Sequence, residues 1–376
     1  MFTESITVGR LFGIRFAVSL SWFLIFFLVT FSLGSVYFPS QYPRWPQALY
    51  WAAGLGASLL FFVCVVLHEL AHSLVALRKK VPVRSITLFL FGGVSQIGKD
   101  APSPGVEFAI ALAGPLTSLG LAALAAGLFL LVRGHSEPMG ALFFWLAGVN
   151  VSLGLFNLLP GFPLDGGRLV RAIVWFAADD FRWATRVATR GGQLAALTIM
   201  LAGGYLLFAH QRGGLANGFW LIFIGWFLFS AANGSYQAML VAHALEGLLT
   251  RDAMRRDPPL VDADSPLREL AEALLANPGR DPWVVVRDGA PLGLIGHGAL
   301  RRVSSERLAL VRVGEAMRRL EPNLILADDL PAGQALQTLL ESGNASLPVV
   351  ADGQVMGLVR RDDLFRLIEI RRRLSR

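Results

Sequence analysis

Cysteine and charge are both scarce in this chain. Of its 376 residues one is a cysteine, Cys64, so the sequence excludes a disulfide framework and every CxxC metal site. Charged residues make up 16% of the chain, whereas an average soluble domain has roughly 25%. Hydrophobic residues reach 54%. This balance predicts an integral membrane protein that lies in a lipid bilayer.

The charge that remains is mostly basic, with a formal net charge of +7. The arginines and lysines stand beside apolar runs and in the C-terminal tail, where membrane topology accounts for them. We therefore expect no nucleic-acid partner. The first apolar run follows Arg10 and Arg15 and lacks a small-residue cleavage site close behind it, so we expect a retained anchor rather than a signal peptide.

Six segments before residue 245 meet or approach the length of about 20 apolar residues that a transmembrane helix needs. They are residues 18–37, 48–77, 106–132, 139–159, 192–210 and 217–241. The excess of Arg and Lys in alternate loops predicts a multi-pass protein of the cell (inner) membrane with both termini and the tail in the cytoplasm. Residues 85–98 are β-branched, contain a Gly-Gly pair and are too short to span as a helix, which predicts a re-entrant or interfacial β-hairpin.

The sequence HELAH, residues 68–72, lies inside the second apolar segment. On a helix, His68 and His72 share a face, so both imidazoles can reach one metal ion, while Glu69 lies one step round and can address a metal-bound water. The alternative interpretation makes both histidines buried polar residues that neighbouring helices satisfy. Ionisable groups inside a span are costly and usually mark a functional path, which favours the metal site.

A catalytic zinc ion takes three protein ligands, so a third is required. Apart from Glu107 at a span boundary, Asp165 is the only other acidic residue embedded in apolar sequence before residue 179. It stands near the end of NLLPGFPLDGG, residues 157–167, whose prolines and glycines break the helix and can carry Asp165 on a rigid turn. The alternative role for Asp165 is the N-cap of a short helix over residues 167–178.

The two motifs together resemble the site-2 proteases, a family of intramembrane zinc metalloproteases, over about residues 5–240. The resemblance implies that His68, His72 and Asp165 bind one Zn²⁺ ion and that Glu69 is the general base. It implies further that Asn157 holds the substrate carbonyl. Substrates of the family are transmembrane segments of membrane-anchored regulatory proteins, so the implied function is regulated intramembrane proteolysis.

The polar tail contains two copies of one pattern. Met254 aligns with Met317, and the turn sequence Asp288-Gly289 aligns with Asp352-Gly353. Each copy predicts a strand, a helix, a hairpin and a helix. The pattern resembles tandem CBS domains, a soluble α+β module. The predicted domains are the protease at 1–245, the first CBS domain at 248–305 and the second at 311–372.

Paired CBS domains often bind adenine nucleotides, so the resemblance implies ATP or AMP as a regulatory ligand, with Arg360 and Asp363 as contacts. The small hydroxyl residue that precedes this aspartate in the family is missing from both copies. A structural module, or one that forms a homodimer, is therefore the alternative.

The predicted fold is a polytopic α-helical membrane protein with about six transmembrane helices and a re-entrant β-hairpin, followed by the tandem CBS module. A rival function is a CBS-regulated transporter or channel in which the His and Asp residues form an ion path. Glu69 separates the two, because a protease with Glu69→Gln keeps zinc and loses all cleavage. A transporter would instead show graded changes in flux.

Overall fold

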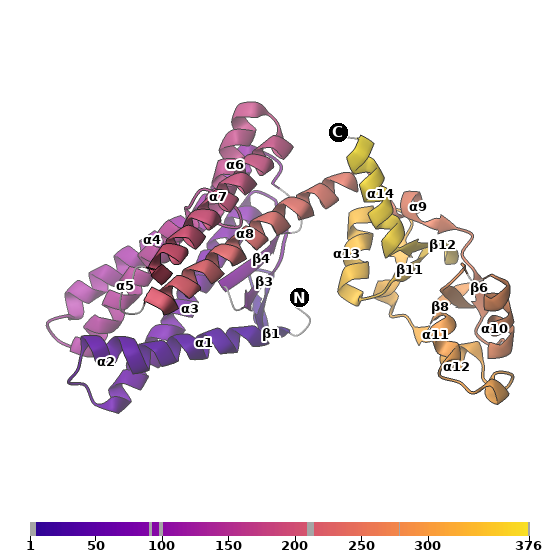
Figure 1. Ribbon diagram of the computed structural model, residues 1–376, viewed down its shortest axis with the longest axis horizontal. Helices are drawn as coiled ribbons and strands as arrows, with labels where there is room; N and C mark the ends of the chain where they lie inside the picture. Colours follow the sequence, from indigo (N-terminus) through magenta and orange to yellow (C-terminus); the bar gives the residue numbers. More distant parts are fainter. Residues whose placement is uncertain (1–4, 90–91, 98–100, 209–213, 278, 375–376) are drawn as a thin grey trace. The chain divides into compact units, whose positions relative to one another are not determined.

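The computed structural model describes residues 5–89, 92–97, 101–208, 214–277 and 279–374. The chain divides into two compact units, Met1–Tyr236 and Gln237–Arg376, and each is described by itself (Figure 1). Helices dominate the first unit, and two small sheets with short helices make up the second.

Six helical segments are long and apolar enough to cross a membrane, and they confirm the predicted number of spans. The first comprises α1 (Leu20–Ser32), a π-helical turn (Leu33–Tyr37) and α2 (Phe38–Gln41), and the others are α3 (Gln47–Arg78), α4 (Pro104–Val132), α5 (Glu137–Asn157), α7 (Phe181–Phe208) and α8 (Gly214–Ala244). The fifth segment begins at residue 181 instead of 192, because its first turns carry polar residues on one face and hide the helix from a purely apolar count. Residues 209 and 210 of the predicted span lie outside the described residues.

Serines are the N-caps of three membrane helices, α1, α4 and α5, and the last two also have a proline in the first turn. The hydroxyls of Ser103 and Ser136 accept hydrogen bonds from the backbone N–H groups of Val106 and Met139, and a proline follows within the first turn of each helix. This is a favourable N-terminus, since the hydroxyl satisfies an N–H that the helix leaves unpaired and proline has none to lose.

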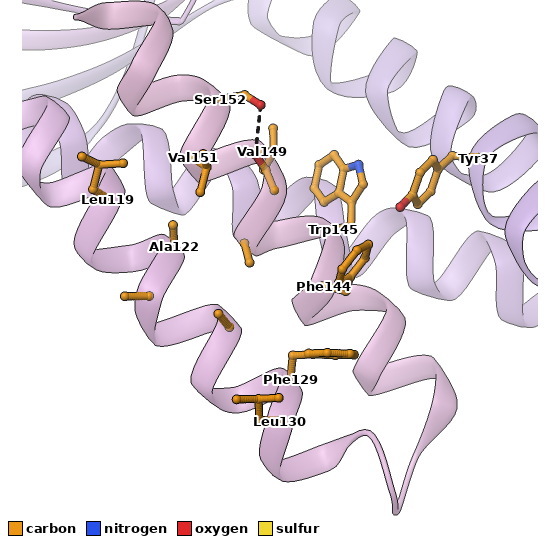
Figure 2. Close-up of a pocket in the computed structure, with 14 residues that line it drawn as sticks. Tyr37, Leu119, Ala122, Phe129, Leu130, Phe144, Trp145, Val149, Val151 and Ser152 are labelled. Carbon is orange, nitrogen blue, oxygen red and sulfur yellow. Dashed lines mark hydrogen bonds between the residues drawn. The ribbon is translucent and has the colours of Figure 1, made fainter.

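An apolar groove of about 830 Å³ runs between α4 and α5 (Figure 2). Its walls include Leu119, Phe129 and Phe144, and the hydroxyl of Ser152 donates to the Gly148 carbonyl of its own helix. The lining offers no carboxylate, imidazole or thiol.

The predicted hairpin is half of a four-stranded sheet. It consists of β3 (Val83–Phe89) and β4 (Gly92–Ile97), with residues 90, 91 and 98 outside the described residues. An N-terminal hairpin of β1 (Ser5–Leu11) and β2 (Ile14–Ser19), which the sequence analysis did not predict, completes the order β1-β2-β3-β4. The strand β3 pairs in parallel with β2 on one side and antiparallel with β4 on the other, so β4 is an edge strand of this sheet.

The second unit contains two four-stranded sheets whose elements follow the predicted order of strand, helix, hairpin and helix. The first copy runs β6 (Leu260–Asp262), α10 (Leu267–Ala276), β7 (Trp283–Arg287), β8 (Ala290–Ile295) and α11 (His297–Leu300), and the second runs β10 (Leu326–Ala327), α13 (Ala332–Ser342), β11 (Ser346–Ala351), β12 (Gln354–Arg360) and α14 (Arg361–Leu374). Both hairpins turn at Asp-Gly pairs with positive φ, at Asp288-Gly289 and Asp352-Gly353. These are the dihedrals that a two-residue hairpin turn needs.

The two copies exchange one strand each. Before the first copy come α9 (Thr250–Ala253) and β5 (Arg255–Arg256), and before the second come α12 (Val313–Ala316) and β9 (Arg318–Arg319). The sheet orders are β6-β7-β8-β9 and β10-β11-β12-β5, so each leading strand joins the sheet of the other copy. Val284, Leu294 and Leu358 bury their side chains together where the sheets meet, and the two copies therefore form one interlocked module.

Candidate metal centre

The helix α3 carries the HELAH sequence in its C-terminal part. His68 and His72 are each 4% exposed, and they lie one turn apart on the face of α3 that packs against α4. No β-branched residue or proline interrupts this turn, so the helix holds both imidazoles on one face.

Both rings are held from behind by α4. Nδ1 of His72 donates to the carbonyl of Ile110 at 2.6 Å, and Nδ1 of His68 lies 2.9 Å from the Ser118 hydroxyl. Because a carbonyl can only accept, Nδ1 of His72 carries a proton, and in the neutral ring the lone pair is on Nε2, which faces the site. Such a bond to the far ring nitrogen is the usual way a protein orients a metal-binding histidine.

Asp165 approaches the histidine pair from a distant part of the chain. Its Oδ2 lies 3.2 Å from Nε2 of His68 and 3.1 Å from Nε2 of His72, and the two Nε2 atoms are 3.2 Å apart. Two ligands of a tetrahedral zinc ion at about 2.0 Å lie about 3.3 Å from each other. The three atoms therefore have the spacing of one face of a zinc coordination tetrahedron, and they form the candidate metal group among the described residues.

The position of Asp165 corrects two expectations. Asp165 is the first residue of α6 (Asp165–Ala178), and the N-cap of this helix is Leu164, so the capping role for Asp165 is wrong. Nor does the aspartate sit on a turn apart from the helix. Close packing of glycines lets α6 begin here, since a Cβ at Gly166 or Gly167 would collide with the backbone of the preceding loop.

A glycine of α4 leaves the space in which the ligand atoms meet. A Cβ built on Gly114 would overlap Nε2 of His72 and of His68. The donor set, the spacing and this cradle all fit a zinc ion.

Glu69 is not part of the ligand triangle, the three atoms Nε2 of His68, Nε2 of His72 and Oδ2 of Asp165. Its Oε2 accepts a hydrogen bond of 2.8 Å from the Ser95 hydroxyl of β4, and a Cβ on Gly93 would collide with its Cγ. Gly93 and Ser95 are two residues apart, so they lie on the same face of the strand. The edge strand β4 therefore packs directly on the glutamate beside the metal ligands.

The predicted oxyanion donor has a different partner in the structure. Asn157 is the last residue of α5, and its amide nitrogen donates to the Leu153 carbonyl of its own helix at 3.0 Å. The described contacts do not bring it to the ligand triangle. Asn150, one helical face away, is fully buried and donates to the Leu146 carbonyl.

Two contacts of this centre were missed by sequence reasoning, namely Ser95 and Ser118. The spacing of Gly114 and Ser118 carried a usable signal, because residues four apart share one helix face. Ser95 carried none, since a serine in a strand gives no sign of which partner it meets.

The predicted nucleotide contacts lie in the second CBS copy. Arg360 ends β12, and Asp363 lies in the first turn of α14. The carboxylate of Asp363 binds the Arg255 guanidinium through two bonds of 2.6 and 2.8 Å, and this pairing lowers the pKa of Asp363. Asp363 therefore already has a cationic partner from the exchanged strand β5.

Two imidazoles, a carboxylate and a neighbouring glutamate, held in a bundle of membrane-length helices, are typical of a membrane metalloenzyme. The sequence profile of Peptidase family M50 matches residues 56–138 and 133–201, and the CBS domain profile matches residues 250–306 and 313–370. Rip3 of Mycobacterium tuberculosis, whose name describes a zinc metalloprotease, is 36% identical over 375 residues, or 98% of this chain and 94% of Rip3. The chain therefore belongs to peptidase family M50, the site-2 proteases, and carries tandem CBS domains.

The chain is also similar to two proteins from Methanocaldococcus jannaschii. The zinc metalloprotease MJ0392 of Methanocaldococcus jannaschii is 27% identical over 97% of this chain and 96% of its own length. The solved site-2 protease from the same organism is 30% identical, has a TM-score of 0.42, and covers 61% of this chain and 94% of its own chain. Both resemblances predicted from the sequence are confirmed, and family membership implies zinc as the metal and a substrate embedded in the membrane.

Proposed function

We propose that this protein is an intramembrane zinc endopeptidase that cuts transmembrane segments of membrane-anchored regulatory proteins. One observation carries the proposal: three ligand atoms lie within 3.2 Å of one another, two from His68 and His72 on a buried face of a helix long enough to cross a membrane and one from Asp165 of α6. Glu69, the next residue on that helix, supplies a base beside them.

Each residue then has one task. His68, His72 and Asp165 hold the zinc ion, which when bound lowers the pKa of a water to about 7 and polarises a carbonyl. Glu69 accepts a proton from the attacking water and delivers it to the departing amide nitrogen. Since Ser95 donates to Oε2, the other oxygen, Oε1, is the one proposed to carry this proton.

Asn157 is the proposed donor to the carbonyl oxygen of the substrate. An amide side chain has two N–H bonds, and the contact with Leu153 uses one of them. The second can stabilise the developing oxyanion, an effect commonly worth about 3 kcal/mol.

A substrate helix must unwind before its peptide bond can be attacked, because helical carbonyls are already hydrogen-bonded. The edge strand β4 is the proposed partner for the unwound segment, by strand addition. This is supported by the contact of Gly93 and Ser95 with Glu69. Proline substitutions within residues 92–96 that left cleavage unchanged would contradict it.

Water is proposed to enter from the cytoplasmic side. His72 is six residues before Arg78, the end of α3, or about 9 Å along the helix axis. The basic loops beside α3 and α6 support a topology with both termini and the CBS module in the cytoplasm.

Regulation by the CBS module is a further part of the proposal, with the protease at 1–245 and CBS domains at 248–305 and 311–372. ATP or AMP would have to compete with the Arg255 guanidinium for the Asp363 carboxylate. The residue after Arg255, the exposed Arg256, offers a second positive charge. Calorimetry of the full chain with ATP and with AMP tests this role. If neither nucleotide gives heat of binding, the CBS domains have a structural role. Sedimentation can then detect whether they join two chains in a homodimer.

The decisive test compares wild type with Glu69→Gln in detergent, using zinc analysis and cleavage of a panel of single-span peptides. We expect full zinc content and no detectable cleavage, since loss of a general base alone lowers the rate roughly 10²- to 10⁴-fold. Glu246→Gln is the matched control, since Glu246 is 72% exposed on the second unit. If Glu69→Gln cleaves as fast as wild type, the role of Glu69 is refuted. Graded changes in ion flux into vesicles would favour a transporter.

A further inference from the structure

An ion pair near the metal centre has no part in the chemistry described above. Glu107, in the first turn of α4, has a side chain with no exposure. Its Oε1 accepts from Nε of Arg171 at 2.8 Å and also from Nη2 of the same guanidinium. Nε of Arg168 lies 3.7 Å from the same oxygen. This carboxylate therefore joins α4 to α6 inside the protein.

The guanidinium of Arg171 touches two further elements. It lies over the ring of Phe162 at 5.1 Å and over the ring of Phe181 at 4.7 Å. Phe162 belongs to the loop that leads into Asp165, and Phe181 is the first residue of α7. One side chain thus holds α4, α7 and the loop before the aspartate together.

The same helices carry the metal centre. From α4 come the Ile110 carbonyl behind His72 and the Ser118 hydroxyl behind His68. From α6 comes Asp165, six residues or about 9 Å before Arg171 along the helix. The distance between the imidazole pair and the carboxylate therefore depends on how α4 and α6 are joined, and Glu107 with Arg171 is the closer of two charged contacts that join them.

We propose that Glu107 and Arg171 are positioning residues that place Asp165 within ligand distance of His68 and His72. This inference rests on the proposed zinc site. A planar guanidinium suits the role, because its donors form a rigid fork and its faces stack on aromatic rings, and a lysine offers neither. Loss of Glu107 leaves the guanidinium of Arg171 without its carboxylate, and loss of Arg171 leaves the buried Glu107 carboxylate with only the longer contact to Arg168. Either change leaves a buried charge poorly compensated, which favours a shift of α6 relative to α4.

The test measures zinc affinity of the full chain in detergent by competition with a chelator, and melting temperature in parallel. The variants are Arg171→Gln, Arg171→Lys, Glu107→Gln and the charge exchange Glu107→Arg with Arg171→Glu. Arg190→Gln is the control, because Arg190 is an exposed arginine of α7. We expect zinc affinity to fall at least about tenfold in both glutamine variants, less in Arg171→Lys, and to recover in part in the charge exchange.

Two results would overturn the inference. Wild-type zinc affinity in a folded variant that lacks the ion pair would reduce the pair to a stabilising contact, which lowers the melting temperature alone. If Arg171→Gln does not fold, Arg171→Lys and Glu107→Gln decide in the same way. Wild-type protein that binds no zinc would instead refute the metal site itself, so the two failures can be told apart.

Discussion

A single methyl group on Gly114 should separate the metal site from the fold that carries it. A Cβ at this position of α4 would meet Nε2 of both His68 and His72 at less than 3.0 Å, whereas ordinary contact begins at 3.4 Å. Either the two rings or the helix must therefore move by about 1 Å. Zinc–ligand distances tolerate only about 0.2 Å, so a movement of this size removes the site.

The magnitude follows from the bonds that such a movement breaks. Rotating the rings away costs His68 its contact with Ser118 at 2.9 Å and His72 its bond to the Ile110 carbonyl at 2.6 Å. Two such bonds are worth about 1–3 kcal/mol together, which is about 5- to 160-fold in zinc affinity. We expect Gly114→Ala to lose at least this much.

The sign of the stability change makes this variant informative. Alanine favours a helix over glycine by about 1 kcal/mol, so the substitution should not unfold α4 through its helix propensity. Gly120→Ala is the matched control, since it lies in the same helix and no described atom lies within 4 Å of its added Cβ. Zinc analysis after dialysis against graded chelator, with melting temperatures, compares the two. Equal zinc affinity in both variants would refute the geometry of the ligand triangle.

Three further predictions concern single side chains. Asp165→Ala should lower zinc affinity at least about 100-fold, because only two of the three protein ligands remain. A chelator titration that matches wild type would exclude Asp165 as a ligand. Ser95→Ala should lower kcat about tenfold at unchanged KM and zinc content, with recovery in Ser95→Thr; an unchanged kcat would deny Ser95 a role in orienting Glu69. Arg255 lowers the pKa of Asp363, so the folded second unit is stabilised above the ordinary pKa of about 3.9 and loses this stability as the pH falls toward the folded-state value. In Asp363→Asn the melting temperature should therefore fall less steeply between about pH 5 and pH 3 than in wild type. The difference in the free energy of unfolding should be at most about 1 kcal/mol, because Arg255 is 48% exposed. An equal dependence of melting temperature on pH in both proteins would show that the pair contributes nothing.

Much of the architecture could be predicted from local sequence. About 20 consecutive apolar residues have one common solution in a bilayer, so six spans could be counted without coordinates. The Asp-Gly turns of the two tail copies likewise require positive φ wherever the chain places them. The N-terminal hairpin was missed because its short strands precede an apolar run that drew attention to the span.

The candidate site divides in the same way. His68, Glu69 and His72 could be recognised from five residues of sequence, because the helix period alone puts both imidazoles on one face. The residues proposed to position this centre could not be recognised in this way. Glu107 stood out only as a charge at the boundary of a span, and Arg171 was only one of the basic residues that indicate topology. A serine, glycine or arginine in an apolar chain has the same local sequence whether it faces lipid or a buried carboxylate.

By itself the sequence determined which segments enter the membrane, which helix presents two imidazoles on one face, and that the tail is a duplicated module. These properties depend on solvent preference and local periodicity, which act over a few turns of chain. The sequence singled out Asp165 as the third ligand, but only the tertiary structure decided the 3.1 Å distance at which it meets His72, 93 residues earlier. The structure alone also decided that Gly114 leaves room for the histidines and that β5 and β9 exchange sheets. Those contacts arise from packing between distant segments, and no spacing along the chain records the distance between their atoms.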